Sequence, residues 1–178
     1  MRLLFTLDLK NYKEGGTVGK RPSVRGIIVR NGLIAMMHSL KYGYYKLPGG
    51  GIEEGESLTD TLLREVREES GLIVLPESIR PFGFVRRIEK GSYEDIFMQE
   101  NYYFLCSAEE VPTAQSLDDY EAEEHFTLEY VSPAHAIRYN EVLLQHLPPE
   151  KPRYHGMLTR ENRVLRLLQE EMPELFQG

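Results

Sequence analysis

Cysteine and long apolar runs are both scarce in this chain. The 178 residues include one cysteine, Cys106, which has no partner for an internal disulfide and belongs to no metal-type cysteine cluster. The first apolar run, residues 1–7, is ended by Asp8 and Lys10 too soon for a signal peptide. No run approaches the roughly 20 apolar residues of a membrane span. We therefore expect a reducing compartment, the cytoplasm, and no contact with a membrane.

Positive charge is also in short supply. Lys and Arg number 21 against 28 Asp and Glu, which gives a formal net charge of −7. Proteins that bind nucleic acid non-specifically depend on basic patches, so we expect no nucleic-acid partner. A small anionic ligand is not excluded, because bound metal ions supply positive charge locally.

The chain length fits one domain with an appended terminal element. We place the domain at residues 1–147, including a short N-terminal segment 1–22, and a C-terminal helical extension at residues 148–178. A Pro-Pro pair opens this extension, which is too short for a self-contained second domain. Within it, residues 159–171 are predicted to form an amphipathic helix. This helix could have one of three roles: it could cover the fold, form a homodimer or shape substrate access.

Residues 1–147 combine strand and helix patterns. We expect strands at 2–9, 24–30, 33–38, 80–88, 96–106 and 124–131, and helices at 57–70 and 133–146. Asn31–Gly32 is the strongest short signal for a β-hairpin. Ser57 and Asp60 form a capping pair at the start of the first helix, and Gly71 follows its end. Strands interleaved with two main helices predict a mixed sheet with helices on its faces.

Three glutamates on the first expected helix are candidates for chemistry. Glu65, Glu68 and Glu69 stand at i, i+3 and i+4, so their carboxylates project from one helix face. Three negative charges this close repel one another unless a cation lies among them. Mg²⁺ favours oxygen ligands and commonly bridges carboxylates to substrate phosphates. We therefore interpret this face as a site for Mg²⁺ or Mn²⁺.

A cluster of glutamates on a helix is usually just a solvated face. The residues around these three glutamates favour a binding site instead. Residues 48–51, Pro-Gly-Gly-Gly, form a loop whose backbone can approach a ligand closely because glycine has no side chain. Arg64 lies four residues before Glu68 and can reach back to Glu56, which would brace the loop against the helix. A loop, a braced helix and a carboxylate cluster together predict a site for a metal–diphosphate complex.

The stretch from residue 50 to residue 72 resembles the Nudix box, Gly-x5-Glu-x7-Arg-Glu-U-x-Glu-Glu-x-Gly-U, in which U is a bulky aliphatic residue. Every defined position matches without an insertion. From typical residue frequencies, a chance match is below roughly one in 10⁷. The flanking strands also resemble the family, from about Ser23 to His146. The matching positions are Gly50, Glu56, Arg64, Glu65, Val66, Glu68, Glu69, Gly71 and Leu72.

The resemblance to Nudix hydrolases implies an α/β/α sandwich with a mixed sheet and a MutT-like, metal-dependent pyrophosphatase. Water would attack a phosphorus of a small nucleotide substrate, either a nucleoside diphosphate derivative or a nucleoside triphosphate. By this resemblance Glu68 and Glu69 bind metal, and Glu65 is a further ligand or the general base. The carbonyl of Gly49 completes the metal shell. The residues expected to support the site structurally are Gly50, Glu56 and Arg64.

Further candidates lie outside the box. Many family members recruit one more carboxylate from a later loop or strand. The carboxylates available here are Glu121, Glu123, Glu124 and Glu129. We select Glu124 as a metal ligand, because it precedes the aromatic strand position Tyr130 by a family-like interval. Tyr44 is a candidate for stacking on a nucleobase and Arg86 for holding a phosphate, although such side chains more commonly fill a strand surface.

A second hypothesis is a Nudix-like module that binds or senses a nucleotide without useful turnover. The complete carboxylate set favours the enzyme, because a sensor has no need of Glu65 or Glu69. The chain also has no DNA-binding pattern and no strongly basic segment to act as an output. Substitution of Glu69 separates the hypotheses, since it abolishes turnover in the enzyme and barely affects a sensor that uses no metal.

Overall fold

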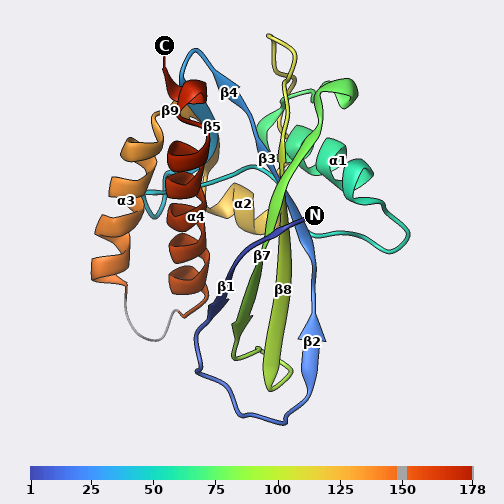
Figure 1. The fold of residues 1–178 in the computed structure, drawn as a ribbon, viewed down its shortest axis with the longest axis vertical. Helices are drawn as coiled ribbons and strands as arrows, with labels where there is room; N and C mark the ends of the chain where they lie inside the picture. Colours follow the sequence, from blue (N-terminus) through green and yellow to red (C-terminus); the bar gives the residue numbers. More distant parts are fainter. Residues whose placement is uncertain (148–151, 178) are drawn as a thin grey trace.

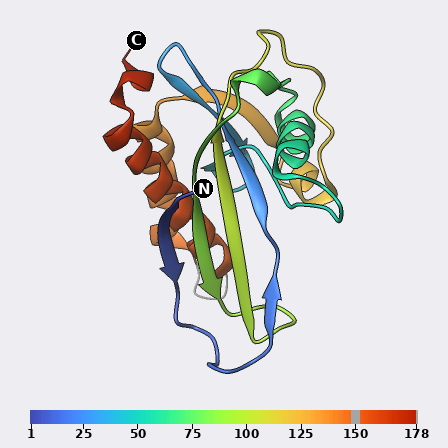
Figure 2. The ribbon, with the colours of Figure 1, turned by 45° about the vertical axis from the view of Figure 1, so that its right-hand side comes forward.

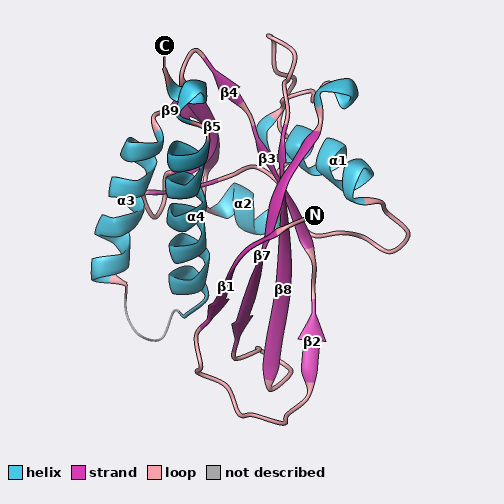
Figure 3. Ribbon diagram, viewed as in Figure 1, coloured by secondary structure: helices cyan, strands magenta, loops and turns pink. Residues whose placement is uncertain are grey.

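The structure is a computed structural model that describes residues 1–147 and 152–177, with residues 152 and 153 described by their backbone alone. Two β-sheets lie between helix α1 on one side and helices α3 and α4 on the other (Figures 1 and 2). The α/β/α layering predicted from the sequence is confirmed (Figure 3). The strands are β1 (Leu3–Asp8), β2 (Val18–Lys20), β3 (Ser23–Ile27), β4 (Val29–Arg30), β5 (Leu33–Ser39), β6 (Tyr44–Lys46), β7 (Arg80–Glu89), β8 (Ile96–Leu105) and β9 (Phe126–Val131). The helices are α1 (Leu58–Ser70), α2 (Asp119–Glu123), α3 (Pro133–His146) and α4 (Pro152–Glu171), with 3-10 turns η1 (Pro76–Ser78) and η2 (Pro173–Phe176).

The first sheet is mixed and contains β1, β7, β8, β2 and β3. Its strand order is β1-β7-β8-β2, and β3 also pairs with β8. Strands β7 and β8 are antiparallel, whereas β1 runs parallel to β7, and β2 and β3 run parallel to β8. Arg25 of β3 stands opposite Tyr103 of β8. Because side chains alternate along a strand and paired positions match, these two side chains lie on the same face of the sheet.

The second sheet joins β4, β5, β6 and β9 in antiparallel pairs. The hairpin predicted at Asn31–Gly32 connects β4 to β5, and its two residues have φ angles of 51° and 75°, as a type I′ turn requires. The single strand predicted over 24–30 is wrong, because the chain changes sheet at Ile28. The Ile27 carbonyl accepts from Cys106 N beyond β8, whereas the Ile28 carbonyl accepts from Ala35 N in β5.

Helix α1 begins and ends where the sequence predicts. Ser57 accepts a hydrogen bond from Asp60 N at 3.1 Å, and Gly71 closes the helix in the left-handed conformation at φ 74°. Leu62 and Val66 are fully buried in the cluster between the helix and β3. This packing sets the rotation of the helix about its own axis, and therefore the direction in which its glutamates point.

Helix α2 is not predicted by the sequence, and it shortens the strand expected over 124–131. Glu121 accepts a hydrogen bond from Asp118 N at 3.3 Å, as the third residue of a capping box does. Glu124 ends this helix, so β9 begins only at Phe126. The acidic segment before β9 is therefore helical, and strand alternation does not describe its side chains.

Helix α4 packs against α3 and against strands β6 and β7. The helix begins at Pro152 rather than at the predicted Thr159. Proline is compatible with this position, because the N–H groups of the first helical turn have no intrahelical acceptor in any case. Val164, Leu165 and Leu168 have no exposed surface, so the helix covers the fold with its apolar face. The boundary predicted at residue 148 falls outside the described residues. Within the described ranges, no helix combines the length and the apolar character needed to cross a membrane.

Candidate functional site

The loop after β6 runs along β3. Val24 N donates to the Gly50 carbonyl and Gly26 N donates to the Pro48 carbonyl, both at 2.9 Å. Between them Gly49 has a φ of 134°, and a Cβ there would lie 2.3 Å from the Val24 carbonyl oxygen, so only glycine fits. Within residues 1–147 and 152–177, no donor bonds the Gly49 carbonyl. Protein donors in these ranges therefore leave that oxygen unused.

Arg64 ties this loop to helix α1. Its guanidinium donates to the Glu56 carboxylate at 2.7 and 2.8 Å and to the Gly51 carbonyl at 3.3 Å. Its Nη1 also donates to Glu65 at 2.8 Å and to Glu68 at 3.1 Å. The hydrogen bonds from Arg64 lower the pKa of Glu56 to about 2, because the cation stabilises the carboxylate. The brace that the spacing suggests is present.

Glu65 lies directly beside the loop at Gly50. A Cβ on Gly50 would stand 2.1 Å from Glu65 Oε2, so the first glycine of the box leaves the space that this carboxylate occupies. The Glu65 side chain is 16% exposed, and burial raises its pKa while Arg64 opposes the shift. Glu68 is more open, at 45% exposed. These two outer carboxylates share one cation but differ in their access to solvent.

Glu69 points into the protein instead. Its carboxylate accepts from Gly49 N at 3.0 Å and from Lys46 Nζ at 2.8 Å. Lys46 Nζ also donates to Glu121 at 3.0 Å, and all three charged side chains are at most 6% exposed. Burial raises the pKa of Glu69, whereas the charge of Lys46 opposes that shift and favours the ionised carboxylate. Glu69 thus joins the glycine loop, β6 and α2.

The sequence reasoning missed Lys46, and it considered Glu121 as a further carboxylate but selected Glu124 instead; both Lys46 and Glu121 contact the box glutamate Glu69 or its partner. The only signal for Lys46 was its place two residues before Pro48 at the end of β6. Glu121, not Glu124, adjoins the Lys46–Glu69 pair, because α2 replaces the strand from which Glu124 was selected. The expectation that Glu124 binds metal stays a prediction, and its carboxylate accepts hydrogen bonds from hydroxyl groups. The hydroxyl groups that donate to the Glu124 carboxylate belong to Ser39 (3.0 Å), Tyr44 (2.6 Å) and Tyr154 (3.1 Å).

The two substrate-binding candidates are engaged elsewhere. Tyr44 is only 2% exposed, and its ring packs edge-on against Phe126 in the interior. Arg86 donates to Glu100 at 2.7 and 3.2 Å. In the part of the chain that the structure describes, neither side chain bonds to a glutamate of the box. Their roles in substrate binding stay predictions.

The oxygen donors of the site match what Mg²⁺ prefers, namely carboxylates and a free backbone carbonyl. As they stand, the described residues contain no group of three or more acidic, histidine or cysteine side chains arranged to hold a metal ion. The cations explain this arrangement, because Arg64 holds Glu65 and Glu68 whereas Lys46 holds Glu69. The residues fit a divalent metal in their chemistry, and in this structure the two cations hold the carboxylates that would bind it.

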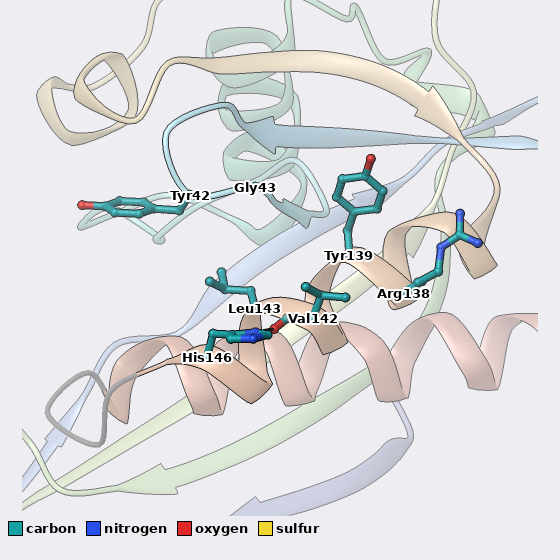
Figure 4. A pocket seen from close by; sticks show the side chains of 7 residues that line it. All are labelled: Tyr42, Gly43, Arg138, Tyr139, Val142, Leu143 and His146. Atoms are coloured by element: carbon teal, nitrogen blue, oxygen red, sulfur yellow. Dashed lines mark hydrogen bonds between the residues drawn. The ribbon is translucent and has the colours of Figure 1, made fainter.

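A pocket of about 480 Å³ lies apart from the box, between the β5–β6 turn and helix α3 (Figure 4). In Figure 4 the aliphatic and imidazole side chains rise from α3, while Tyr42 extends from the turn. None of its lining residues belongs to the glycine loop or to α1, so this hollow is separate from the carboxylate site. The lining residues are Tyr42, Gly43, Arg138, Tyr139, Val142, Leu143 and His146.

Solved structures with a similar fold include two from bacteria. The mutator MutT protein of Bacillus halodurans is 21% identical with a TM-score of 0.54, and the match covers 67% of this chain and 72% of that one. A NUDIX hydrolase of Nitrosomonas europaea is 17% identical with a TM-score of 0.53, covering 69% of this chain and 79% of that one. At these identities the likeness concerns the fold alone.

Relatives in sequence include nucleoside triphosphatase NudI of Escherichia fergusonii, 38% identical over 60 residues. NudI of Escherichia coli O139:H28 is 40% identical over 60 residues. Each match covers 34% of this chain and 43% of the relative, so it spans less than half the length of those proteins. The family model of the NUDIX domain matches residues 19–154, well over half of the chain. The chain therefore belongs to the NUDIX domain family.

Proposed function

We propose that the chain hydrolyses the diphosphate linkage of a small nucleotide, either a nucleoside diphosphate derivative or a nucleoside triphosphate, with a divalent metal ion. The observation that carries this proposal is the direct contact between the glycine loop and the carboxylates of α1. Glu69 accepts from Gly49 N, and Glu65 occupies the space beside Gly50. A free carbonyl beside three carboxylates suits a metal–diphosphate complex. The NudI relatives are named nucleoside triphosphatases, which makes triphosphates the first substrates to test.

Each residue of the site has a definite part in this proposal. Glu68, Glu69 and the Gly49 carbonyl are assigned as metal ligands, and Glu65 as a further ligand or the general base. A bound divalent ion would neutralise charge on the diphosphate and activate water. Arg64 holds the loop against the helix through its bonds to the Gly51 carbonyl and to the loop glutamate. We propose Mg²⁺, with Mn²⁺ as the alternative, and a reducing cytoplasm because the single cysteine is a free thiol.

The test is hydrolysis of a substrate panel with Mg²⁺, in which added phosphatase reveals masked products. The panel contains ordinary and oxidised triphosphates, nucleotide sugars, ADP-ribose and dinucleoside polyphosphates. Glu68→Gln is a cleaner variant than Glu69→Gln, because Glu68 is half-exposed and its carboxylate bonds only Arg64 among the residues that the structure describes. We expect Glu68→Gln to lower turnover at least about 100-fold with an unchanged melting temperature. Glu54→Gln, at an exposed loop position that the box leaves undefined, should keep wild-type turnover.

The outcomes separate the enzyme from the sensing module. Turnover of one substrate class that is lost in Glu68→Gln and on chelation with EDTA, yet retained in Glu54→Gln, would support the hydrolase. Silence across the panel, with nucleotide binding still detectable, would support a module that senses a nucleotide. Equal turnover in wild type and Glu68→Gln would overturn the assignment of Glu68 as a ligand.

A further inference from the structure

Arg25 presents unused hydrogen-bond donors next to the glycine loop. A Cβ on Gly49 would lie 3.0 Å from Arg25 Cα, so the loop crosses β3 at this residue. Arg25 Nε and Nη1 are shielded from solvent, and neither has a hydrogen-bond partner. No ion pair engages this guanidinium among the side chains that the structure describes. Leaving a buried charged donor without an acceptor is unfavourable, so an anion that supplied one would be stabilised here.

The side chains beside Arg25 are also short of acceptors. Tyr103, its partner on β8, is fully buried, and within the described ranges its hydroxyl has no hydrogen-bond partner. Arg160 of α4 donates to Asn101 and Glu161, but its Nε has no acceptor. Burial raises the pKa of Tyr103 while Arg160 and Arg25 oppose the shift, as expected for neighbouring charges. Tyr103 Oη and Arg160 Nε are therefore two further buried donors that no acceptor in the described part of the chain engages.

The box glutamates do not supply the missing acceptor, although they are near. Gly49 adjoins both sides of the site, because a Cβ there would lie 3.0 Å from Arg25 Cα and its N–H donates to Glu69 at 3.0 Å. The box carboxylates nevertheless bond to Arg64, Lys46 and the loop backbone instead. A diphosphate bridged to the glutamates by metal would bring its own anionic oxygens to the same place.

We propose that Arg25 binds a phosphate oxygen of the substrate, with the buried donors of Tyr103 and Arg160 adding positive potential behind it. The planar guanidinium suits this role, because it can form two parallel hydrogen bonds to one phosphate group. Arg25 as a whole is only partly buried, although its Nε and Nη1 atoms are shielded. The identity of the anion as a nucleotide diphosphate rests on the proposed function.

The test compares Arg25→Met and Arg25→Lys with wild type in kinetics and in binding of α,β-methylene-ADP, a diphosphate whose carbon bridge resists hydrolysis. Calorimetric titration with Mg²⁺ present then reports binding without turnover. We expect Arg25→Met to weaken binding and to lower kcat/KM by about 10- to 100-fold, since a charge-assisted double hydrogen bond is lost. The affinity and kcat/KM of Arg25→Lys should lie between those of wild type and Arg25→Met, because lysine keeps the positive charge and loses the second, parallel hydrogen bond.

Arg30→Met is the matched control. Arg30 lies on the adjacent strand β4, and its guanidinium already donates to the carbonyls of residues 108–110. We expect this variant to keep the wild-type dissociation constant and KM. A common loss in Arg25→Met and Arg30→Met would overturn a specific role for Arg25, because both variants remove an arginine from neighbouring strands.

The results distinguish this proposal from the proposed function. If wild type turns over a substrate, Glu68→Gln does not, and Arg25→Met keeps the wild-type affinity, then the proposal for Arg25 is wrong and the hydrolase stands. If no substrate is turned over but α,β-methylene-ADP binds wild type and not Arg25→Met, the hydrolase fails and the anion site stands. Should Arg25→Met fail to fold, Arg25→Lys decides alone: weaker binding supports the site, and unchanged binding overturns it.

Discussion

The glutamates of helix α1 divide into an outer and an inner region that differ in exposure and in partner. In the outer region Glu65 and Glu68 share Arg64, and all three side chains meet solvent to some degree. In the inner region Glu69 is buried and pairs with Lys46, which Glu121 also holds. Solvent screens the outer pairs, whereas the inner pair combines a stronger attraction with a larger loss of hydration.

This difference separates two tasks along a single turn of helix. The outer carboxylates can turn toward a ligand at little cost, because exposed ion pairs contribute little to stability. The inner carboxylate has a fixed direction, since Gly49 N and Lys46 each bond one of its oxygens. Glu69 therefore positions the glycine loop in addition to its proposed role as a metal ligand, whereas the Glu68 carboxylate bonds only Arg64 among the described residues.

The largest expected effect comes from breaking the inner region with Lys46→Met. Glu69 and Glu121 would remain buried without their cation, which we expect to cost about 3–5 kcal/mol of unfolding free energy. Urea denaturation measures this loss. Lys41→Met is the matched control: it removes an exposed pair with Glu123 and should cost less than about 1 kcal/mol.

A double variant sharpens the same test. Adding Glu69→Gln to Lys46→Met removes one of the two uncompensated carboxylates, so part of the lost stability should return. If Lys46→Met and Lys41→Met lose similar stability, or if the double variant recovers nothing, the buried ion pairs do not hold the inner region together.

The outer region could be predicted from the sequence, and the inner region could not. The bond between Arg64 and Glu56 follows from two positions of the box that are close in the sequence. The caps of helix α1 likewise lie at the residues that the local sequence pattern predicts. The contact between Lys46 and Glu121 instead requires α2, a five-residue helix that is too short to be predicted from hydrophobic periodicity. Arg25 likewise meets Tyr103 only because β3 pairs with β8, a contact between distant segments. Such contacts follow from tertiary packing, which overrides local pattern.

The intermediate effect comes from Gly50→Ala, which acts on the outer region alone. The new methyl group would occupy the position of the Glu65 carboxylate and displace it. We expect kcat/KM to fall about 10- to 100-fold, since a misplacement near 1 Å has effects of that order, with a small loss of stability. In Gly51→Ala the methyl group meets only the flexible Arg21 guanidinium, at 3.2 Å, so activity should stay near wild type. Equal activities in the two variants would show that Glu65 adapts to the methyl group freely.

The smallest expected effect is a change in the pH dependence of stability in Glu56→Gln. Hydrogen bonds from Arg64 hold the pKa of Glu56 at about 2 in the folded chain, against an ordinary value of 4.5. A carboxyl with a depressed folded pKa contributes its full stability above pH 4.5, and that contribution is lost as the pH falls from 4.5 toward 2. Wild type should therefore melt at a higher temperature than Glu56→Gln above pH 4.5, and the two melting curves should converge near pH 2.

Added salt separates the two regions once more. Glu56 and Arg64 are partly exposed, so the melting-temperature difference between wild type and Glu56→Gln should shrink as ionic strength rises. The loss caused by Lys46→Met should change much less, because its ion pairs are shielded from counter-ions. The melting-temperature difference between wild type and Glu56→Gln could instead persist at pH 2 or stay constant as salt is added. Either result would mean that the carboxylate acts by its shape and its hydrogen bond with Thr61 rather than by its charge.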